Sequence, residues 1–184
     1  MTELYFIRHA KPDYSVHEDA LRPLTELGHE QAHALVEKFS HIRFGAAYSS
    51  AFLRCISTLQ PLAQAQNLAI FTHDGLQERK IDSGWIEDFD AFAKQQWADF
   101  QYKRSNGECL AEVQRRNIKA VTEILTVEAG KTIAIGTHGT AFATILNHYH
   151  PDFGYESFQR IAPITPYVYH MSFDGKNLLS DREL

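Results

Sequence analysis

Residues 4–9, Leu4-Tyr5-Phe6-Ile7-Arg8-His9, form an uninterrupted apolar run that ends abruptly in two basic side chains. Short continuous apolar runs of this kind are typical of strands that are buried on both faces. A second such run, residues 132–135, ends in the polar stretch 136–139. Strands buried on both faces occur mainly in parallel sheets that helices cover on each side. The two runs therefore predict an α/β fold.

The rest of the chain supports this prediction, because strand-like and helix-like segments alternate along it. The predicted helices are 25–40, 52–66, 108–128 and one that begins near 140, and the predicted strands are 4–7, 46–48, 68–71, 132–135 and a terminal hairpin from 167. Such alternation implies a layered α/β domain. We expect one three-layer α/β/α sandwich over residues 1–184, with a mostly parallel sheet and an antiparallel edge strand.

Residues 80–107 interrupt this alternation. They carry an aromatic helical face between Phe89 and Phe100, with several carboxylates beside it. Packing is the more common role of such a face than ligand binding. We therefore predict that this segment is a small cap inserted in the domain.

Composition narrows the functional class. The chain has 184 residues, an apolar share of 44% and a formal net charge of −5, without a block of like charges. Nucleic acids and anionic membranes favour basic partners, so neither is expected to be the main partner. No apolar run approaches the roughly 20 residues of a membrane span, and the first residues do not resemble a signal peptide. We expect a cytoplasmic protein, and the sequence assigns no oligomeric state.

Basic side chains follow three of the predicted strands. Arg8-His9, Ser49-Ser50 with Arg54, and Thr137-His138 all lie where a strand ends. In α/β sheets, ligands bind outside the carboxyl ends of the strands, so these groups are expected to meet. Guanidinium groups match phosphate oxygens, and a neutral imidazole is a competent nucleophile. The pattern predicts a pocket for a phosphoryl group.

Six short motifs along the chain resemble those of the histidine phosphatase superfamily, the phosphoglycerate mutase-like enzymes. They are Phe6-Ile7-Arg8-His9-Ala10, Leu24-Thr25 to Gly28 with Gln31-Ala32, Ser49-Ser50 with Arg54 and Thr58, Leu76-Gln77-Glu78, Gly107-Glu108-Cys109, and Thr137-His138-Gly139. Each motif alone is weak, but six in the family's order are specific. The resemblance implies the phosphoglycerate mutase-like fold.

The resemblance also implies catalytic roles. His9 is expected to be the nucleophile that becomes phosphorylated, and Arg8, Arg54 and His138 are expected to bind the transferred phosphoryl group. Glu78 is expected to protonate the leaving oxygen. The implied reaction is hydrolysis of a small phosphorylated metabolite by a phosphoric monoester hydrolase, without a metal or other cofactor.

Three further positions are candidates for the site: two for contact with the substrate and one as an alternative general acid. Ser15 stands where relatives often have an asparagine that touches phosphate, and Gly139 completes the second-histidine motif. Both are expected to contact the substrate. Asp82 lies close to Glu78 in sequence and is an alternative general acid.

Three other functions stay open at this point. One is a cofactor-dependent phosphoglycerate mutase, which would return the phosphoryl group to the substrate. Another is a non-catalytic binder of phosphorylated ligands. The third is a zinc hydrolase, because His29-Glu30-Gln31-Ala32-His33 reads as the HExxH motif. For the substrate, the carboxylates and aromatics of the predicted cap favour an apolar or cationic part over a polyanion.

Overall fold

The computed structural model describes residues 1–84 and 86–184. Its sheet has the strand order β3-β2-β4-β1-β5-β6. The strands are β1 (Thr2–Arg8), β2 (Ala46–Ser49), β3 (Ile70–Thr72), β4 (Thr132–Thr137), β5 (Val168–Asp174) and β6 (Asn177–Glu183). The first four strands of that order run parallel, and β5 and β6 are antiparallel to their neighbours. The predicted fold class is confirmed, and β5 and β6 form the predicted terminal hairpin.

The apolar run that opens the chain forms the centre of the sheet as β1. Its side chains alternate between the two faces, as the two-residue period of a strand requires. Leu4 and Phe6 belong to the core on one face, whereas Tyr5 and Ile7 belong to the core on the other. Because all four side chains are buried, the strand must be covered on both sides.

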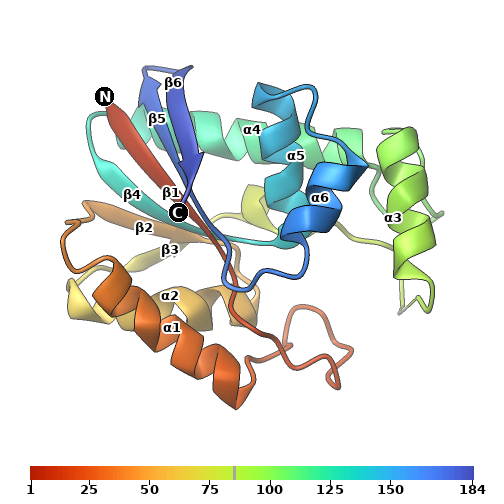
Figure 1. Cartoon of the computed structure of the whole chain (residues 1–184), viewed down its shortest axis with the longest axis horizontal. Coiled ribbons are helices and arrows are strands. Elements are labelled where there is room, and N and C mark those ends of the chain that lie inside the picture. Colours follow the sequence, from red (N-terminus) through yellow and green to blue (C-terminus); the bar gives the residue numbers. More distant parts are fainter. Residues whose placement is uncertain (85) are drawn as a thin grey trace.

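Helices supply this cover and complete three layers (Figure 1). The helices are α1 (Glu26–Lys38), α2 (Leu53–Ala65), α3 (Phe89–Ala98), α4 (Leu110–Val127), α5 (Gly139–Tyr149) and α6 (Tyr155–Ile161), with a short 3-10 helix η1 (Asp74–Leu76). Helices α1 and α2 pack on the face of Tyr5 and Ile7, and α4 and α5 pack on the opposite face. Helix α6 is not among the elements expected from the sequence.

Thr25 caps the start of α1, the helix that the sequence predicts over 25–40. The Thr25 side chain accepts a hydrogen bond from the Gly28 backbone N–H at 3.0 Å, which satisfies one of the free amides of the first turn. Gly28 also lies against the loop that follows β1, since a Cβ at this position would meet the Lys11 carbonyl oxygen at 2.2 Å. The motif around Thr25 therefore sets how closely α1 approaches the end of β1.

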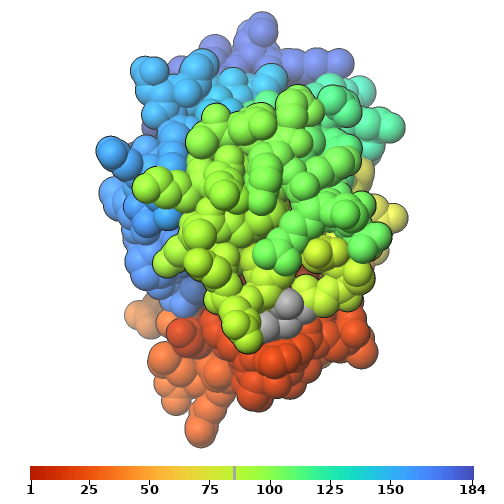
Figure 2. All heavy atoms as spheres, turned by 90° about the vertical axis from the view of Figure 1, so that its right-hand side faces the viewer, coloured from red at the N-terminus to blue at the C-terminus, as the bar shows by residue number. Residues whose placement is uncertain are grey.

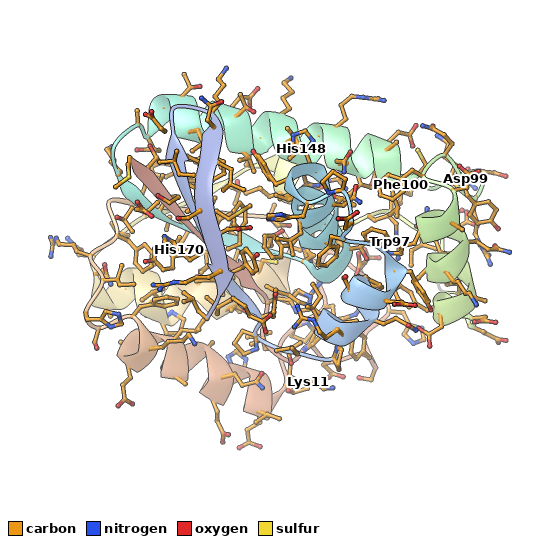
Figure 3. All side chains as sticks on the ribbon, turned by 45° about the horizontal axis from the view of Figure 1, so that its top comes forward. Lys11, Trp97, Asp99, Phe100, His148 and His170 are labelled. Atoms are coloured by element: carbon orange, nitrogen blue, oxygen red, sulfur yellow. The ribbon has the colours of Figure 1, made fainter. Side chains whose placement is uncertain are left out.

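Helix α3 lies at one end of the molecule, beyond the sheet (Figure 1). Trp97 stacks on Phe158 of α6 with ring centroids 5.7 Å apart, and Figure 3 shows Trp97 and Phe100 between α3 and the main body. From this end, the green α3 segment lies above the orange N-terminal segment (Figure 2). The segment 80–107 includes residue 85, which lies outside the described residues, and its role as a cap stays a prediction. None of the described helices has the length and apolar character needed to cross a bilayer.

Candidate active site

The three strand ends that the sequence marks as reactive meet at one edge of the sheet. The register pairs Arg8 of β1 with Thr137 of β4, which places His9 next to His138, with ring centroids 5.4 Å apart. A cleft of about 1200 Å³ opens at this edge and is lined by Arg8, His9 and Arg54, among others. The sheet thus brings these side chains together as expected.

His9 is almost fully buried and has a defined orientation. Its Nδ1 lies 2.9 Å from the Ala10 carbonyl oxygen, and a carbonyl can only accept, so Nδ1 carries the proton. Burial, followed by the charges of Arg54 and Arg8, lowers the pKa of His9 well below its usual 6.5. The imidazole is therefore neutral near neutral pH, with the lone pair on Nε2.

Arg8 is buried beside His9, and the fold anchors one end of its guanidinium. Nη1 donates to the carbonyl oxygens of Ala162 at 2.6 Å, Ile164 at 3.1 Å and Ile161 at 3.3 Å. Nε is buried and has no partner among the described residues. A buried donor of this kind is costly unless a ligand satisfies it. The three printed hydrogen bonds use Nη1 alone, and Arg8 lines the cleft, so Nη2 is the donor suited to an anionic oxygen of a ligand.

Arg54 is the second buried guanidinium of the cleft, and an acidic side chain already contacts it. Nη2 lies 3.2 Å from a carboxylate oxygen of Asp19, and Nη1 donates to the Asp19 backbone carbonyl. Asp19 also accepts from Arg22 at 2.8 Å, and its side chain is 46% exposed. The loop that carries Asp19 therefore holds a negative charge against the cations of the cleft, a feature that the sequence does not reveal.

His138 lies behind His9 and is completely buried. Its Nε2 is 2.8 Å from the Ser50 hydroxyl and 3.4 Å from the Cys55 thiol, which also approaches the Thr137 carbonyl oxygen at 3.2 Å. Burial, with a further contribution from nearby cations, lowers the pKa of His138 well below its usual 6.5. His138 is thus a second neutral imidazole at the site. The thiol of Cys55 packs against it, and burial raises the thiol pKa.

Glu78 enters the site from the segment that follows η1. Its two carboxylate oxygens accept the backbone N–H groups of Thr140 at 3.0 Å and Ala141 at 2.9 Å, and one also accepts that of Arg79 at 2.7 Å. Thr140 and Ala141 belong to the first turn of α5, where free amides and the helix dipole favour an anion. The N-terminus of α5 therefore positions Glu78 next to the second-histidine motif.

Arg116 of α4 braces the backbone that carries Glu78. Its guanidinium donates to the carbonyl oxygens of Gly75 at 3.1 Å, Gln77 at 2.7 Å and Glu78 at 3.0 Å. It also contacts both carboxylate oxygens of Glu108, at 2.8 and 2.9 Å. Glu108 belongs to the Gly-Glu-Cys motif, so the structure gives this motif a supporting contact. The sequence contains no signal that would select Arg116 for this position.

Asp82, the alternative acid, also lines the cleft but is held by its own loop. Its carboxylate accepts the Ser83 backbone N–H at 2.8 Å and the Asn106 amide at 3.2 Å, and lies 3.8 Å from Arg104. Hydrogen bonds from Ser83 and Asn106 lower its pKa. Asp82 thus engages exposed groups of the 82–106 loops, whereas Glu78 engages the helix that follows His138.

Two other candidates lie differently. Ser15 is exposed, and its hydroxyl and backbone N–H both bind one carboxylate oxygen of Asp13, at 2.7 and 2.9 Å. This local turn uses both hydrogen-bond donors of Ser15. Ser15 is also not among the described residues that line the cleft. Gly139, by contrast, lines the cleft. A Cβ there would meet the Arg8 guanidinium at 3.1 Å.

The histidines of the HExxH-like stretch lie on α1. His29, Glu30 and His33 are all exposed, and none is among the described residues that line the cleft. Within the ranges 1–84 and 86–184, no cluster of three metal-ligating side chains is arranged to hold an ion. The structure thus places these three side chains on the exposed side of α1, outside the described lining of the cleft.

Comparisons with known proteins agree with this architecture. The family model described as histidine phosphatase superfamily (branch 1) matches residues 4–180. The chain is 25% identical to phosphoserine phosphatase 1 of Hydrogenobacter thermophilus, over 75% of this chain and 71% of the relative. It is 27% identical to the probable phosphoglycerate mutase GpmB of Yersinia pestis, over 80% and 74%.

Two solved structures show how far the fold agrees. YhfR of Bacillus stearothermophilus superposes with a TM-score of 0.78 at 22% identity, covering 97% of this chain and 95% of that one. Phosphoserine phosphatase of Entamoeba histolytica in complex with 3-phosphoglyceric acid gives 0.79 at 18% identity, covering 97% and 94%. These likenesses support the fold, and the family model covers nearly the whole sequence. The chain belongs to branch 1 of the histidine phosphatase superfamily.

Proposed function

We propose that this protein hydrolyses small phosphate monoesters through a phosphohistidine formed on His9, without a metal or other cofactor. The observation that carries the proposal is the hydrogen bond between Nδ1 of His9 and the Ala10 carbonyl oxygen. It leaves the lone pair on Nε2 of a neutral imidazole, in a cleft that Arg8 and Arg54 also line. A neutral imidazole beside two guanidinium groups combines a nucleophile with a binding site for the phosphoryl group.

In the first step, Nε2 of His9 attacks the phosphorus atom. The P–N bond forms while the bond between phosphorus and the ester oxygen breaks, and Glu78 gives a proton to the departing oxygen. Arg8, Arg54 and His138 bind the phosphoryl oxygens. The two guanidinium groups are fixed cations, which stabilise charge in phosphoryl transfer through positioning and electrostatics, and the neutral imidazole of His138 would contribute a hydrogen bond.

In the second step, water is the acceptor. Glu78 removes a proton from the water molecule, whose oxygen attacks phosphorus as the P–N bond breaks. The electron pair returns to Nε2 of His9, and inorganic phosphate leaves. The sum is one ester and one water converted to one alcohol and one phosphate, with the enzyme restored. The segment 80–107 would act as a cap over this cleft, and the cytoplasmic location stays a prediction.

The relatives support a phosphoryl-transfer function, and one is named as a phosphatase and another as a mutase. A phosphoglycerate mutase is therefore the second candidate. It would use the same phosphohistidine but transfer the group to another hydroxyl of the substrate. If 3-phosphoglycerate were converted to 2-phosphoglycerate faster than phosphate is released, the mutase assignment would replace hydrolysis.

The test is hydrolysis of p-nitrophenyl phosphate in EDTA by the wild type, His9→Ala and His33→Ala. The proposal predicts that the wild type is active in EDTA, that His9→Ala is inactive, and that His33→Ala matches the wild type. His33 is exposed on α1, which makes it a matched control for a histidine replacement. Loss of activity in EDTA and in His33→Ala together would instead support a zinc hydrolase. Binding of phosphate without hydrolysis of any ester would support a non-catalytic binder.

A further inference from the structure

The carboxylate of Asp19 bridges two buried arginines of the cleft. Its Oδ1 lies 2.8 Å from Nη1 of Arg22 and 3.2 Å from Nη2 of Arg54. All three residues line the cleft, and only 7% of Arg22 and 2% of Arg54 is exposed. Guanidinium groups bind the oxygens of carboxylates and of phosphates in the same way. A group of the protein itself therefore contacts donors that also suit a phosphoryl group.

The two bridged arginines act on the nucleophile. After burial, Arg54, Arg8 and, to a smaller degree, Arg22 lower the pKa of His9. Arg54 is also one of the proposed ligands of the transferred phosphoryl group. A phosphoryl group attacked by His9 would therefore share Arg54 with the carboxylate of Asp19 unless that carboxylate moves.

Arg54 has no free edge for a ligand while Asp19 is in place. Its Nη1 donates to the Asp19 backbone carbonyl, and its Nη2 lies beside the Asp19 carboxylate. The ring of Phe52 lies 5.0 Å from its central carbon. A bidentate contact with two phosphoryl oxygens uses two nitrogens on one edge of the guanidinium, and each such edge includes Nη2. Two anions at this nitrogen would repel each other.

An exchange of one anion for the other is electrostatically balanced. Burying a cation without a counter-charge is expensive, and in the free protein Asp19 supplies that charge to Arg54 and Arg22. A bound phosphoryl group would supply it instead. The Asp19 side chain is 46% exposed, so its carboxylate would return to water rather than stay buried without a partner.

The loop that carries Asp19 is held mainly by polar contacts. Residues 13–21 are all exposed or partly exposed, so the loop buries little apolar surface. Its base is closed by the bridge between Pro12 and Leu24, and its far side is tied to α2 by the Leu53 N–H, which donates to the Ala20 carbonyl at 2.9 Å. Figure 1 shows the chain between β1 and α1 as a loop that extends beyond the sheet. Segments with few buried apolar contacts open at low cost in free energy.

We propose that Asp19 is an autoinhibitory group, which occupies Arg54 and Arg22 in the free protein and must be displaced by the phosphoryl group of a substrate. The proposal rests on the proposed function, in which Arg54 binds that group. The same competition acts on the product. When inorganic phosphate leaves, the carboxylate returns to the two arginines, so Asp19 weakens product binding and promotes release.

The experiment measures binding of inorganic phosphate by calorimetry to the wild type, Asp19→Asn and Asp19→Ala. We expect both variants to bind phosphate about three- to tenfold more tightly, between the effects of an exposed ion pair and of a buried charged hydrogen bond. In steady-state assays, KM for p-nitrophenyl phosphate and the inhibition constant of phosphate should fall by similar factors. The use of two variants separates the loss of the charge from any hydrogen bond that asparagine keeps.

Glu18→Gln is the matched control. Glu18 is the neighbouring residue of the same loop, is exposed and also lines the cleft. Its carboxylate makes no hydrogen bond or ion pair with a described residue. The variant removes the same charge without removing a contact to an arginine. We expect its phosphate affinity to stay within about twofold of the wild type, because water and salt screen an exposed charge.

The outcomes separate this proposal from the proposed function. Phosphate affinity that is unchanged or weaker in both Asp19 variants would show that Asp19 only positions Arg54, and would overturn the proposal while the phosphatase stands. Equal tightening in Glu18→Gln would also overturn it, since the effect would then come from the overall charge of the loop. If p-nitrophenyl phosphate is not hydrolysed, the proposed function fails. The calorimetric comparison still decides whether Asp19 competes with phosphate.

Discussion

The guanidinium of Arg8 packs directly against the backbone of Gly139. A Cβ at position 139 would lie 3.1 Å from Cζ of Arg8 and 3.2 Å from Nε and from Nη2. Arg8 has little freedom to retreat, because three backbone carbonyls bind its Nη1. The second-histidine motif therefore sets the position of Arg8, the proposed phosphate ligand, as well as that of His138.

Gly139→Ala should weaken catalysis while leaving the protein folded. The added methyl group would shift Arg8 by a few tenths of an ångström, and misplacement of about 1 Å costs roughly a hundredfold in rate. We expect kcat/KM for p-nitrophenyl phosphate to fall by about tenfold. Gly154→Ala is the control, because a Cβ there meets nothing within 4 Å. Equal activity of the two variants would argue against the contact.

Glu78→Gln should impair poor leaving groups more than good ones. If Glu78 protonates the leaving oxygen, its loss matters most for alkyl phosphates, whose alkoxide leaves poorly without a proton. General acid catalysis contributes about 10²–10⁴-fold, so we expect a loss in this range for glycerol 3-phosphate and a smaller one for p-nitrophenyl phosphate. Asp82→Asn should not change the ratio of the two activities. The reverse pattern would identify Asp82 as the acid.

Removal of Arg116 should act through Glu78. Arg116→Gln leaves Glu108 without its cation and three carbonyls without a donor, and each lost charged hydrogen bond typically costs about 1.5–3 kcal/mol. Because the Arg116 side chain is 24% exposed, we expect the free energy of unfolding to decrease by an amount near the lower end of that range. The activity ratio of glycerol 3-phosphate to p-nitrophenyl phosphate should also drop. Arg115→Gln, at an exposed neighbouring position, should change neither quantity.

The pH profile should reflect the buried state of His9. Its pKa is lowered well below 6.5 by burial and by Arg54 and Arg8. Attack requires the neutral imidazole, so activity is present above this pKa and is lost as the pH falls through it. We expect kcat/KM, corrected for ionisation of the substrate, to show no acid limb near pH 6.5. If kcat/KM instead falls as the pH drops through the ordinary histidine pKa of 6.5, the His9 pKa is not lowered, and this electrostatic picture is contradicted.

Replacing Arg54 should move that limb in a defined direction. Arg54 is the largest contributor after burial to the low pKa of His9. In Arg54→Gln we therefore expect the acid limb to shift toward higher pH, together with a lower kcat/KM from weaker phosphate binding. The position of the limb and the height of the plateau are independent readouts. A plateau that drops without any shift of the limb would show that Arg54 binds phosphate without tuning His9.

Much of the fold follows from local sequence signals. Buried strands such as β1 and β4 are short apolar runs with abrupt polar ends, and Thr25 is a strong helix cap, so their positions could be predicted to within a few residues. Helix α6 could not, because seven residues are too few to show a clear helical period. Strand β3 begins at Ile70 and ends at Thr72, later than the apolar pattern suggests, since its pairing with β2 decides its limits.

The site divides in the same way. Side chains that follow strand ends, such as Arg8, His9 and His138, could be placed because parallel strands end at one edge of a sheet. Ser15 could not, because the turn that it forms with Asp13 depends on local geometry. The ion pair between Arg54 and Asp19 is likewise invisible in the sequence. It is a property of the packed structure.

The most direct test of the account is to trap the phosphoenzyme. The protein would be mixed with p-nitrophenyl phosphate labelled in the phosphoryl group, quenched in alkali within milliseconds, digested and analysed by mass spectrometry. The proposed mechanism predicts label on the peptide that contains His9, and no label in His9→Gln. Turnover without label at His9, or label that persists in His9→Gln, would contradict a phosphohistidine mechanism at this residue.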